Sequence, residues 1–162
     1  MIGLESFAER STETEIIDDM MLESGAMAEV LRDLSVINRY LGGYRTTLDA
    51  LPALLPRGAA SVRVLDVGAG GGDMARVLVD WGRSRGQRVE VVAVDLSQSA
   101  ASYARDRLRD YPQITVVQAD VLALPFEPES FDVVLCALFL HHFRQPDAVR
   151  LLRAMHDASR HG

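Results

Sequence analysis

From residue 61 onward, short apolar runs alternate with stretches of helical periodicity, and this alternation restricts the fold more than any other feature of the chain. The runs typical of buried strands are Val62–Val67, Val89–Asp95, Ile114–Gln118 and Phe131–Ala137. Between them, apolar residues recur at helical spacing, which places them on one face of a helix. Near-continuous apolar strands joined by helices are typical of a parallel sheet covered on both faces. We therefore predict an α/β fold in three α/β/α layers.

The first 58 residues follow a different pattern, which indicates helices without strands. An amphipathic helix that contains Met27 and Leu41 is predicted to end at the adjacent glycines 42 and 43. A second amphipathic stretch covers Tyr44–Leu55, and Thr12–Leu22 has the pattern of a shorter acidic helix. We predict that residues 1–58 form a helical cap and that residues 59–162 form the α/β ligand-binding domain.

The composition excludes several classes of protein. All 17 residues counted as lysine or arginine are arginine. Phosphate loops of the GxxxxGK[ST] type and pyridoxal enzymes both need a lysine, so neither can be built from this chain. The formal net charge is −6, which argues against a nucleic-acid partner because such partners usually require a basic surface. We expect a small-molecule partner instead.

Other features bear on compartment and metal binding. Cys136 is the single cysteine and cannot form an internal disulfide. The first residues lack the pattern of a signal peptide, and no apolar run approaches the roughly 18 residues of a membrane helix. We therefore expect a cytoplasmic protein without a membrane partner. The adjacent His141 and His142 lack further ligands at metal-site spacing, so no metal is expected.

The segment VLDVGAGGGD joins the first predicted strand to its helix, and its glycines let a ligand approach the backbone closely. Asp66 and Asp73 flank these glycines, and two carboxylates would repel a pyrophosphate but attract a cationic ligand. Asp95 ends the second strand, where a carboxylate can accept hydrogen bonds from a ribose diol, and Asp120 follows the third. In a parallel sheet these strand ends form the ligand crevice.

The motifs LDVGAGGGD, VAVDLS, ADVLALPF and FDVVLCALFLHHF occur here in the order and spacing found in class I S-adenosylmethionine-dependent methyltransferases. Residues 61–162 resemble that family, and most closely its ubiquinone/menaquinone-type and related small-molecule members. The resemblance implies a Rossmann-like methyltransferase fold with strand order 3-2-1-4. It also implies S-adenosyl-L-methionine as the cofactor and a small-molecule acceptor methylated on oxygen, nitrogen or carbon.

The resemblance assigns the glycine loop to the methionyl part of the cofactor. The backbone of Gly68, Ala69, Gly70 and Gly72 would hold that part, and Asp66 would help to order the loop. An internal brace is the more ordinary role for Asp66, without direct ligand contact.

The resemblance assigns the following strand ends to the rest of the cofactor. Asp95 would take the ribose hydroxyls and Leu96 would pack on the adenine. Asp120 and Val121 would read the adenine edge, and Cys136 would line the methyl-donor end. Taken singly, Asp95 and Asp120 would be ordinary surface acids. Their shared position after successive strands favours a functional role.

The catalytic group is less well defined by the sequence. His141 and His142 follow the fourth strand, and histidine is the usual general base near neutral pH. Methyl transfer from a sulfonium uses an already activated donor, so positioning and exclusion of water can supply most of the rate. A general base is therefore optional: His141 and His142 are only weak catalytic candidates, and structural hydrogen bonding or packing beside the adenosyl group is the more ordinary role for each.

The length departs from the resemblance, because family members usually continue through a fifth strand and an antiparallel hairpin. We expect the fourth strand to form an exposed sheet edge, which implies either a fragment of a longer methyltransferase or a homodimer that covers this edge. A second hypothesis is a non-catalytic or truncated cofactor-binding module that acts through dimerisation or a partner chain. A nicotinamide-dependent oxidoreductase is disfavoured because no dehydrogenase motif places a proton donor.

Overall fold

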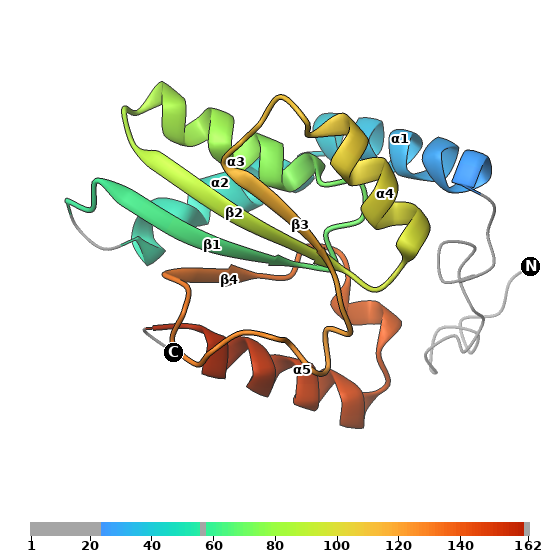
Figure 1. The fold of residues 1–162 in the computed structure, drawn as a ribbon. Coiled ribbons are helices and arrows are strands. Elements are labelled where there is room, and N and C mark those ends of the chain that lie inside the picture. The colour runs from blue at the N-terminus through green and yellow to red at the C-terminus, as the bar shows by residue number, and fades with distance from the viewer. Residues whose placement is uncertain (1–23, 56–57, 161–162) are drawn as a thin grey trace, which may run out of the picture.

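The structure is a computed structural model, and it describes residues 24–55 and 58–160 (Figure 1). The predicted helix Thr12–Leu22 lies outside the described residues. Within the described ranges, no helix combines the length and the apolar character needed to cross a membrane.

A four-stranded parallel sheet carries the fold. Its strands are β1 (Ser61–Val67), β2 (Arg88–Asp95), β3 (Ile114–Gln118) and β4 (Val133–Leu135). They lie in the order β3-β2-β1-β4, and every neighbouring pair is parallel (Figure 1). This confirms the predicted α/β class and the strand order 3-2-1-4.

The fourth strand is shorter than predicted, because Phe131–Ala137 was expected and only Val133–Leu135 pairs as a strand. Pairing with β1 ends where Leu135 lies opposite Asp66, one residue before β1 itself ends at Val67. At its other end, Phe131 forms an isolated parallel bridge with Ser159. The paired strand is therefore shorter than the apolar run in the sequence.

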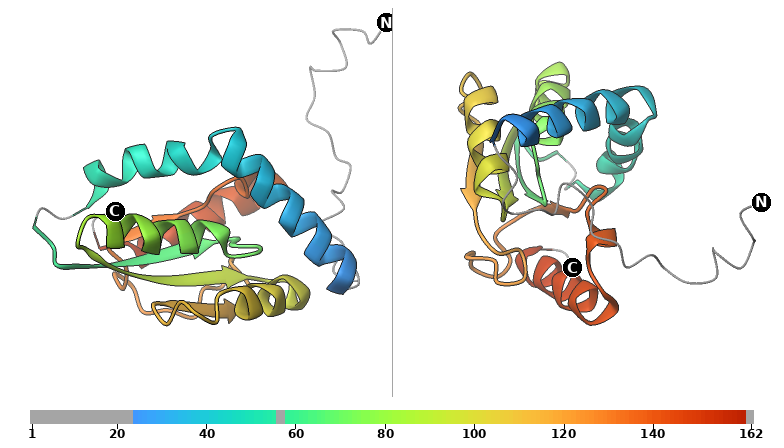
Figure 2. Two further views of the ribbon diagram at one scale, coloured as in Figure 1. Left: turned by 90° about the horizontal axis from the view of Figure 1, so that it is seen from above. Right: turned by 90° about the vertical axis from the view of Figure 1, so that its right-hand side faces the viewer.

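The helices divide between the two faces of the sheet. They are α1 (Ser24–Tyr40), α2 (Gly43–Leu54), α3 (Asp73–Ser84), α4 (Gln98–Arg107) and α5 (Gln145–Ala158). Figures 1 and 2 show α1 to α4 on one side of the sheet and α5 on the other, which gives the three predicted layers. The helices predicted at residues 27–41 and 44–55 correspond to α1 and α2, and we call this pair the cap.

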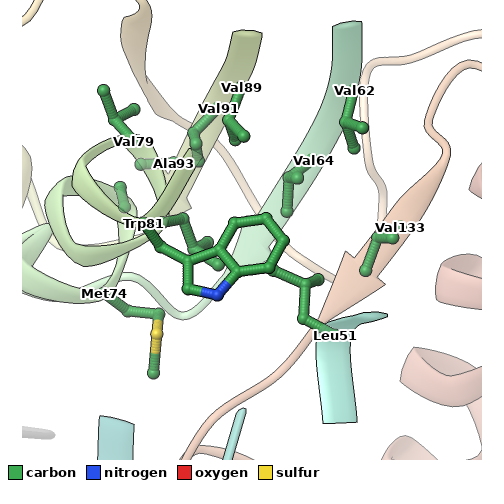
Figure 3. Packing of buried hydrophobic residues seen from close by; sticks show 12 residues of the cluster. Leu51, Val62, Val64, Met74, Val79, Trp81, Val89, Val91, Ala93 and Val133 are labelled. Carbon is green, nitrogen blue, oxygen red and sulfur yellow. The ribbon is translucent and has the colours of Figure 1, made fainter. Parts of the chain in front are cut away.

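Each face of the sheet has its own core because successive strand residues point to opposite sides. On the cap side, Val64 and Val91 pack with Trp81 of α3 and Leu51 of α2 (Figure 3). On the α5 side, buried residues of β1 and β2 pack with Leu151 and with the segment that follows β3. This alternation decides which residues at the strand ends face the cap.

Candidate functional site

A cavity of about 580 Å³ lies between the cap and the carboxyl ends of β1 and β2. Its wall comes from four parts of the chain: α1 and the start of α2, the glycine loop, the end of β2 with the start of α4, and residues 137–143. It therefore lies at the strand ends where the sequence predicts a ligand crevice.

Asp66 is the buried acid of this cavity. It follows Val64 by two residues on β1 and so points to the same face, toward the cap. The residue is 2 % exposed, and its Oδ2 has no hydrogen-bond partner in the structure. Burial, together with the negative charges of Asp73 and Asp95, raises the pKa of Asp66 from 3.8 to about 7. A cation bound beside this buried carboxyl would stabilise its ionised form.

Asp95 connects the glycine loop to α4. Its Oδ2 accepts a hydrogen bond from the Gly70 amide at 2.8 Å, and its Oδ1 accepts one from the Ser97 amide at 2.9 Å. Burial raises the pKa of Asp95, although these backbone donors and the positive field of His142 oppose the rise. The hydroxyl of Ser97 accepts from the Ala100 amide, which confirms Ser97 as the N-cap of α4.

The amides of the glycine loop are directed to acceptors within the protein. Gly68 and Ala69 both donate to the Val94 carbonyl at 2.9 Å, and Gly72 donates to the Ala69 carbonyl at 2.9 Å. A pyrophosphate site needs such amides to point at the ligand. With the Gly70 amide bonded to Asp95 as well, the loop lacks the donor array typical of a dinucleotide site.

Gly68 is required by its surroundings. Its φ of 72° lies in the left-handed region, and a β-carbon at this position would overlap the ring of Phe139. The Phe139 ring in turn packs edge-on against Phe143, with centroids 5.1 Å apart. The glycine loop and the segment after β4 are therefore in direct contact at the floor of the cavity.

The cap contributes two contacts to the site that the sequence did not predict. Leu31 of α1 is 3 % exposed and lies so close to the loop that a β-carbon on Gly70 would be 3.1 Å from its Cδ2. Tyr44 of α2 donates a hydrogen bond from its hydroxyl to Asp73 Oδ2. Apolar spacing places Leu31 on the buried face of α1, but only the tertiary fold shows what that face covers.

The segment after β4 forms the remaining wall. It contains a short 3-10 turn, Leu140–His142, and the rings of His141 and His142 lie with centroids 4.1 Å apart. Both histidines line the cavity. Leu138, also in the wall, has a φ of 54°, which is unusual for a residue with a side chain.

Four of the residues predicted to bind the cofactor lie outside the cavity wall. Gly72 faces Leu108 of the core, and Val121 is buried in the core on the α5 side. Asp120 is exposed, and its Oδ1 accepts from the Leu122 amide at 2.8 Å. Strand alternation turns Cys136 toward the α5 side, so Ala137 takes the place in the wall. The other predicted residues, Asp66, Gly68, Ala69, Gly70, Asp95 and Leu96, line the cavity together.

The comparison with protein families explains this geometry. Residues 64–162 match the family model described as a methyltransferase domain. The chain belongs to this family. The methyltransferase domain thus begins inside β1 and includes the glycine loop, all of the strand ends and α5.

Individual relatives agree with this membership. The ubiquinone/menaquinone biosynthesis C-methyltransferase of Idiomarina loihiensis is 30 % identical over 149 residues, which cover 90 % of this chain and 55 % of that protein. A 2-phytyl-1,4-naphtoquinone methyltransferase of Thermosynechococcus vestitus is 40 % identical over 77 residues, which cover 48 % of this chain and 32 % of the relative. The chain thus spans about half, or less, of the length of these curated relatives.

A solved structure extends the likeness to the fold. A protein from Methanococcus maripaludis, described as a putative S-adenosyl-L-methionine-dependent methyltransferase, superimposes with a TM-score of 0.65. It is 16 % identical, and the match covers 93 % of this chain and 63 % of the other. The methyltransferase domain therefore has the Rossmann-like fold of that class.

Family membership implies S-adenosylmethionine as the cofactor, and the cavity residues fit it. The cofactor carries a sulfonium and an ammonium, and the unpartnered buried Oδ2 of Asp66 is suited to a cation. Asp73 and Asp95 add negative charge to the same cavity. The loop amides that a pyrophosphate would need are bonded elsewhere, so these residues suit a sulfonium nucleoside better than a dinucleotide.

Proposed function

We propose that this domain binds S-adenosylmethionine and transfers its methyl group to a small-molecule acceptor. The observation that carries the proposal is the buried Asp66 carboxyl, which has an unpartnered oxygen beside the glycine loop and faces the same cavity as Asp95. When bound, the cofactor supplies an activated methyl group, and the acceptor must approach it in line.

The roles of the chain's own residues follow from their positions in the wall. Asp66 offsets positive charge at the glycine loop. Asp95 supports both the loop and the start of α4, and in the resemblance it is the acid that takes the ribose hydroxyls. Leu31 covers the loop from the cap side and excludes water from it. Together these residues bind, orient and shield the donor.

The acceptor we propose is a small apolar ring compound. The wall also contains polar residues such as Asn38 and the two histidines, but much of it is apolar and includes Leu34, Ile37, Leu138, Phe139 and Phe143. The relatives from Idiomarina and Thermosynechococcus carry names that refer to ubiquinone, menaquinone and a phytyl-naphthoquinone. A ring of that chemical kind suits this wall better than a sugar or a peptide does.

His141 and His142 remain the candidates for a proton acceptor, because both line the cavity. Methylation of a ring carbon releases the proton of that carbon, and a nearby imidazole can accept it. The test replaces each with glutamine and measures the pH profile of methyl transfer. Loss of the acidic limb in one variant identifies the base, and an unchanged profile in both variants assigns the histidines a structural role.

The binding half of the proposal is tested by calorimetry with S-adenosylhomocysteine. We expect wild-type protein to bind it and Asp95→Asn to bind at least about tenfold more weakly, the cost of one hydrogen bond to a charged group. Asp106→Asn is the matched control, since Asp106 is an exposed acid of α4. Absence of binding by wild-type protein would refute the cofactor assignment.

The transfer half requires an assay with a radiolabelled methyl donor and simple quinols as acceptors. A labelled quinol supports the enzyme. Cofactor binding without transfer to any ring acceptor supports the alternative, a non-catalytic module that acts through a partner chain or through a dimer. The edge position of β4 is the feature that supports a dimer, because an edge strand presents unpaired backbone groups.

A further inference from the structure

Tyr44 joins three helices at a single hydroxyl group. It belongs to α2, its hydroxyl donates to Asp73 Oδ2 at the start of α3, and the Ser35 carbonyl oxygen of α1 lies 3.1 Å from the same hydroxyl. Asp73 and Tyr44 are 29 residues apart in sequence. This is a polar connection between the cap and the helix that follows the glycine loop.

The connection lies in the wall of the cavity, to which Tyr44 and Asp73 both contribute. Asn38, Tyr44 and Asp73 reach the wall from α1, α2 and the start of α3, while Leu96 and Ala100 reach it from the end of β2 and from α4. If the adenosine part of the cofactor lies beside Leu96, as the resemblance implies, the methionyl part extends past the glycine loop toward Tyr44. The inference below rests on that proposed function.

The surroundings keep this hydrogen bond in place. Burial raises the pKa of Tyr44, and the hydrogen bond to Asp73 and its negative charge raise it further. The hydroxyl therefore stays protonated and remains a donor throughout the neutral range. A hydrogen bond between a neutral donor and a carboxylate is stronger than one between two neutral groups. It also turns Asp73 Oδ2 toward α2.

The turn before Tyr44 holds the residue in position. Gly42 has a φ of 86°, and a β-carbon on Gly43 would lie 3.1 Å from Asn38 Oδ1. The two cap helices are therefore packed tightly where the chain reverses. Because Tyr44 follows this turn directly, the position of its hydroxyl is tied to the position of both helices.

We propose that Tyr44 is a positioning residue for the cofactor: through its hydrogen bond to Asp73 it fastens the cap over the methionyl end of the cavity. Leu31 closes the middle of the cavity by apolar contact with the glycine loop, and Tyr44 supplies the polar fastening at the end. Loss of the hydroxyl leaves the adenosine end intact.

The test uses Tyr44→Phe in the full chain and two ligands, S-adenosylhomocysteine and adenosine, in titration calorimetry. We expect the variant to bind S-adenosylhomocysteine about tenfold more weakly than wild type, the value of one hydrogen bond to a charged group. Adenosine, which lacks the methionyl part, should bind both proteins equally. A defect that merely loosens the fold would weaken both ligands alike, and that result overturns the proposal.

The matched control is Tyr111→Phe. The Tyr111 hydroxyl donates to Asp80 Oδ2 of the same helix α3 at 3.2 Å, and neither residue lines the cavity. This variant removes a tyrosine–aspartate hydrogen bond of the same type and should bind both ligands like wild type. An equal loss of S-adenosylhomocysteine affinity in both tyrosine variants overturns the assignment to Tyr44.

A double-mutant cycle shows whether Tyr44 acts through Asp73. In an Asp73→Ala background, Tyr44→Phe should cost no further affinity for S-adenosylhomocysteine, because its partner is already absent. Additive losses overturn the inferred connection. If wild-type protein binds neither ligand, the proposed function itself is refuted. If wild-type protein binds both ligands and Tyr44→Phe has no effect, only the inference about Tyr44 is refuted.

Discussion

The Asp66 carboxyl couples the stability of the fold to pH. Its pKa is about 7 in the folded protein and 3.8 in its ordinary state, mainly because of burial. Between these values the folded chain keeps a proton that the unfolded chain releases, so rising pH favours unfolding. The contribution is fully present below a pH of about 3.8 and is lost as the pH rises through about 7.

We therefore predict that Asp66→Asn flattens the pH dependence of stability. The wild-type free energy of unfolding should fall, relative to the variant, by up to about 1.4 kcal/mol per pH unit between the two pKa values. Urea denaturation of both ligand-free proteins at several pH values measures the difference, in which the contribution of Asp95 largely cancels. Parallel curves for the two proteins would show that Asp66 does not titrate in this range.

Gly68 allows a separate prediction about backbone and packing. Gly68→Ala combines a left-handed φ with overlap on Phe139, whereas Gly86→Ala has a φ of 66° with nothing within 4 Å. We expect about 1 kcal/mol of destabilisation at Gly86 and about 1–3 kcal/mol more at Gly68. Thermal unfolding measures both, and calorimetry should show loss of S-adenosylhomocysteine binding at Gly68 alone. Equal destabilisation by the two substitutions would contradict the contact with Phe139.

Helix α1 is held to the rest of the protein by a small apolar cluster. Met27 and Leu31 pack with Ala100 and Tyr103 of α4, apart from the two larger cores. Because the cluster is small, removal of one large side chain should loosen the whole helix. The glycine loop below it would then be exposed to water.

We predict that Leu31→Ala weakens S-adenosylhomocysteine binding and increases hydrogen exchange along α1. Truncation of a buried leucine lowers the free energy of unfolding by about 2–5 kcal/mol in a well-packed core. Here we expect the loss to weaken mainly the packing of α1 against the rest of the domain, so that α1 opens locally. Leu41→Ala is the control, because Leu41 is 81 % exposed and should have little effect. Unchanged exchange in α1 of the Leu31 variant would contradict this view of the cluster.

Particular elements show what the sequence could and could not predict. Valine-rich runs such as Val89–Asp95 predict strands because they are apolar throughout, and Ser97 predicts a helix start because its hydroxyl can cap free amides. The bounds of β4 depend on its pairing with β1, and the side of the sheet to which Cys136 points depends on that register. The contact between Tyr44 and Asp73 depends on how the cap packs, which local patterns do not determine.

The oligomeric state of the protein depends on what covers the outer edge of β4. Among the described residues, β4 pairs with β1 on one side, and on the other side the chain returns only beside the residues that precede β4, where the Phe131 amide donates to the Ala158 carbonyl and the Arg160 amide donates to the Phe131 carbonyl. Unless a further strand of a longer chain covers this edge, we propose that a second copy of the chain does, since unpaired strand groups favour association. Sedimentation velocity over a range of concentrations should give the mass of a dimer. A monomer at every concentration would contradict the proposal.

Trp81 offers a practical route to these measurements. It is the single tryptophan of the chain, it is 8 % exposed, and it packs in one cluster with Leu51 of the cap and Val133 of β4 (Figure 3). The Arg85 guanidinium also lies 4.4 Å from its ring centroid. Because the sheet and the cap together surround this indole, its fluorescence emission is an intrinsic optical reporter of whether α2 is docked, with no added label.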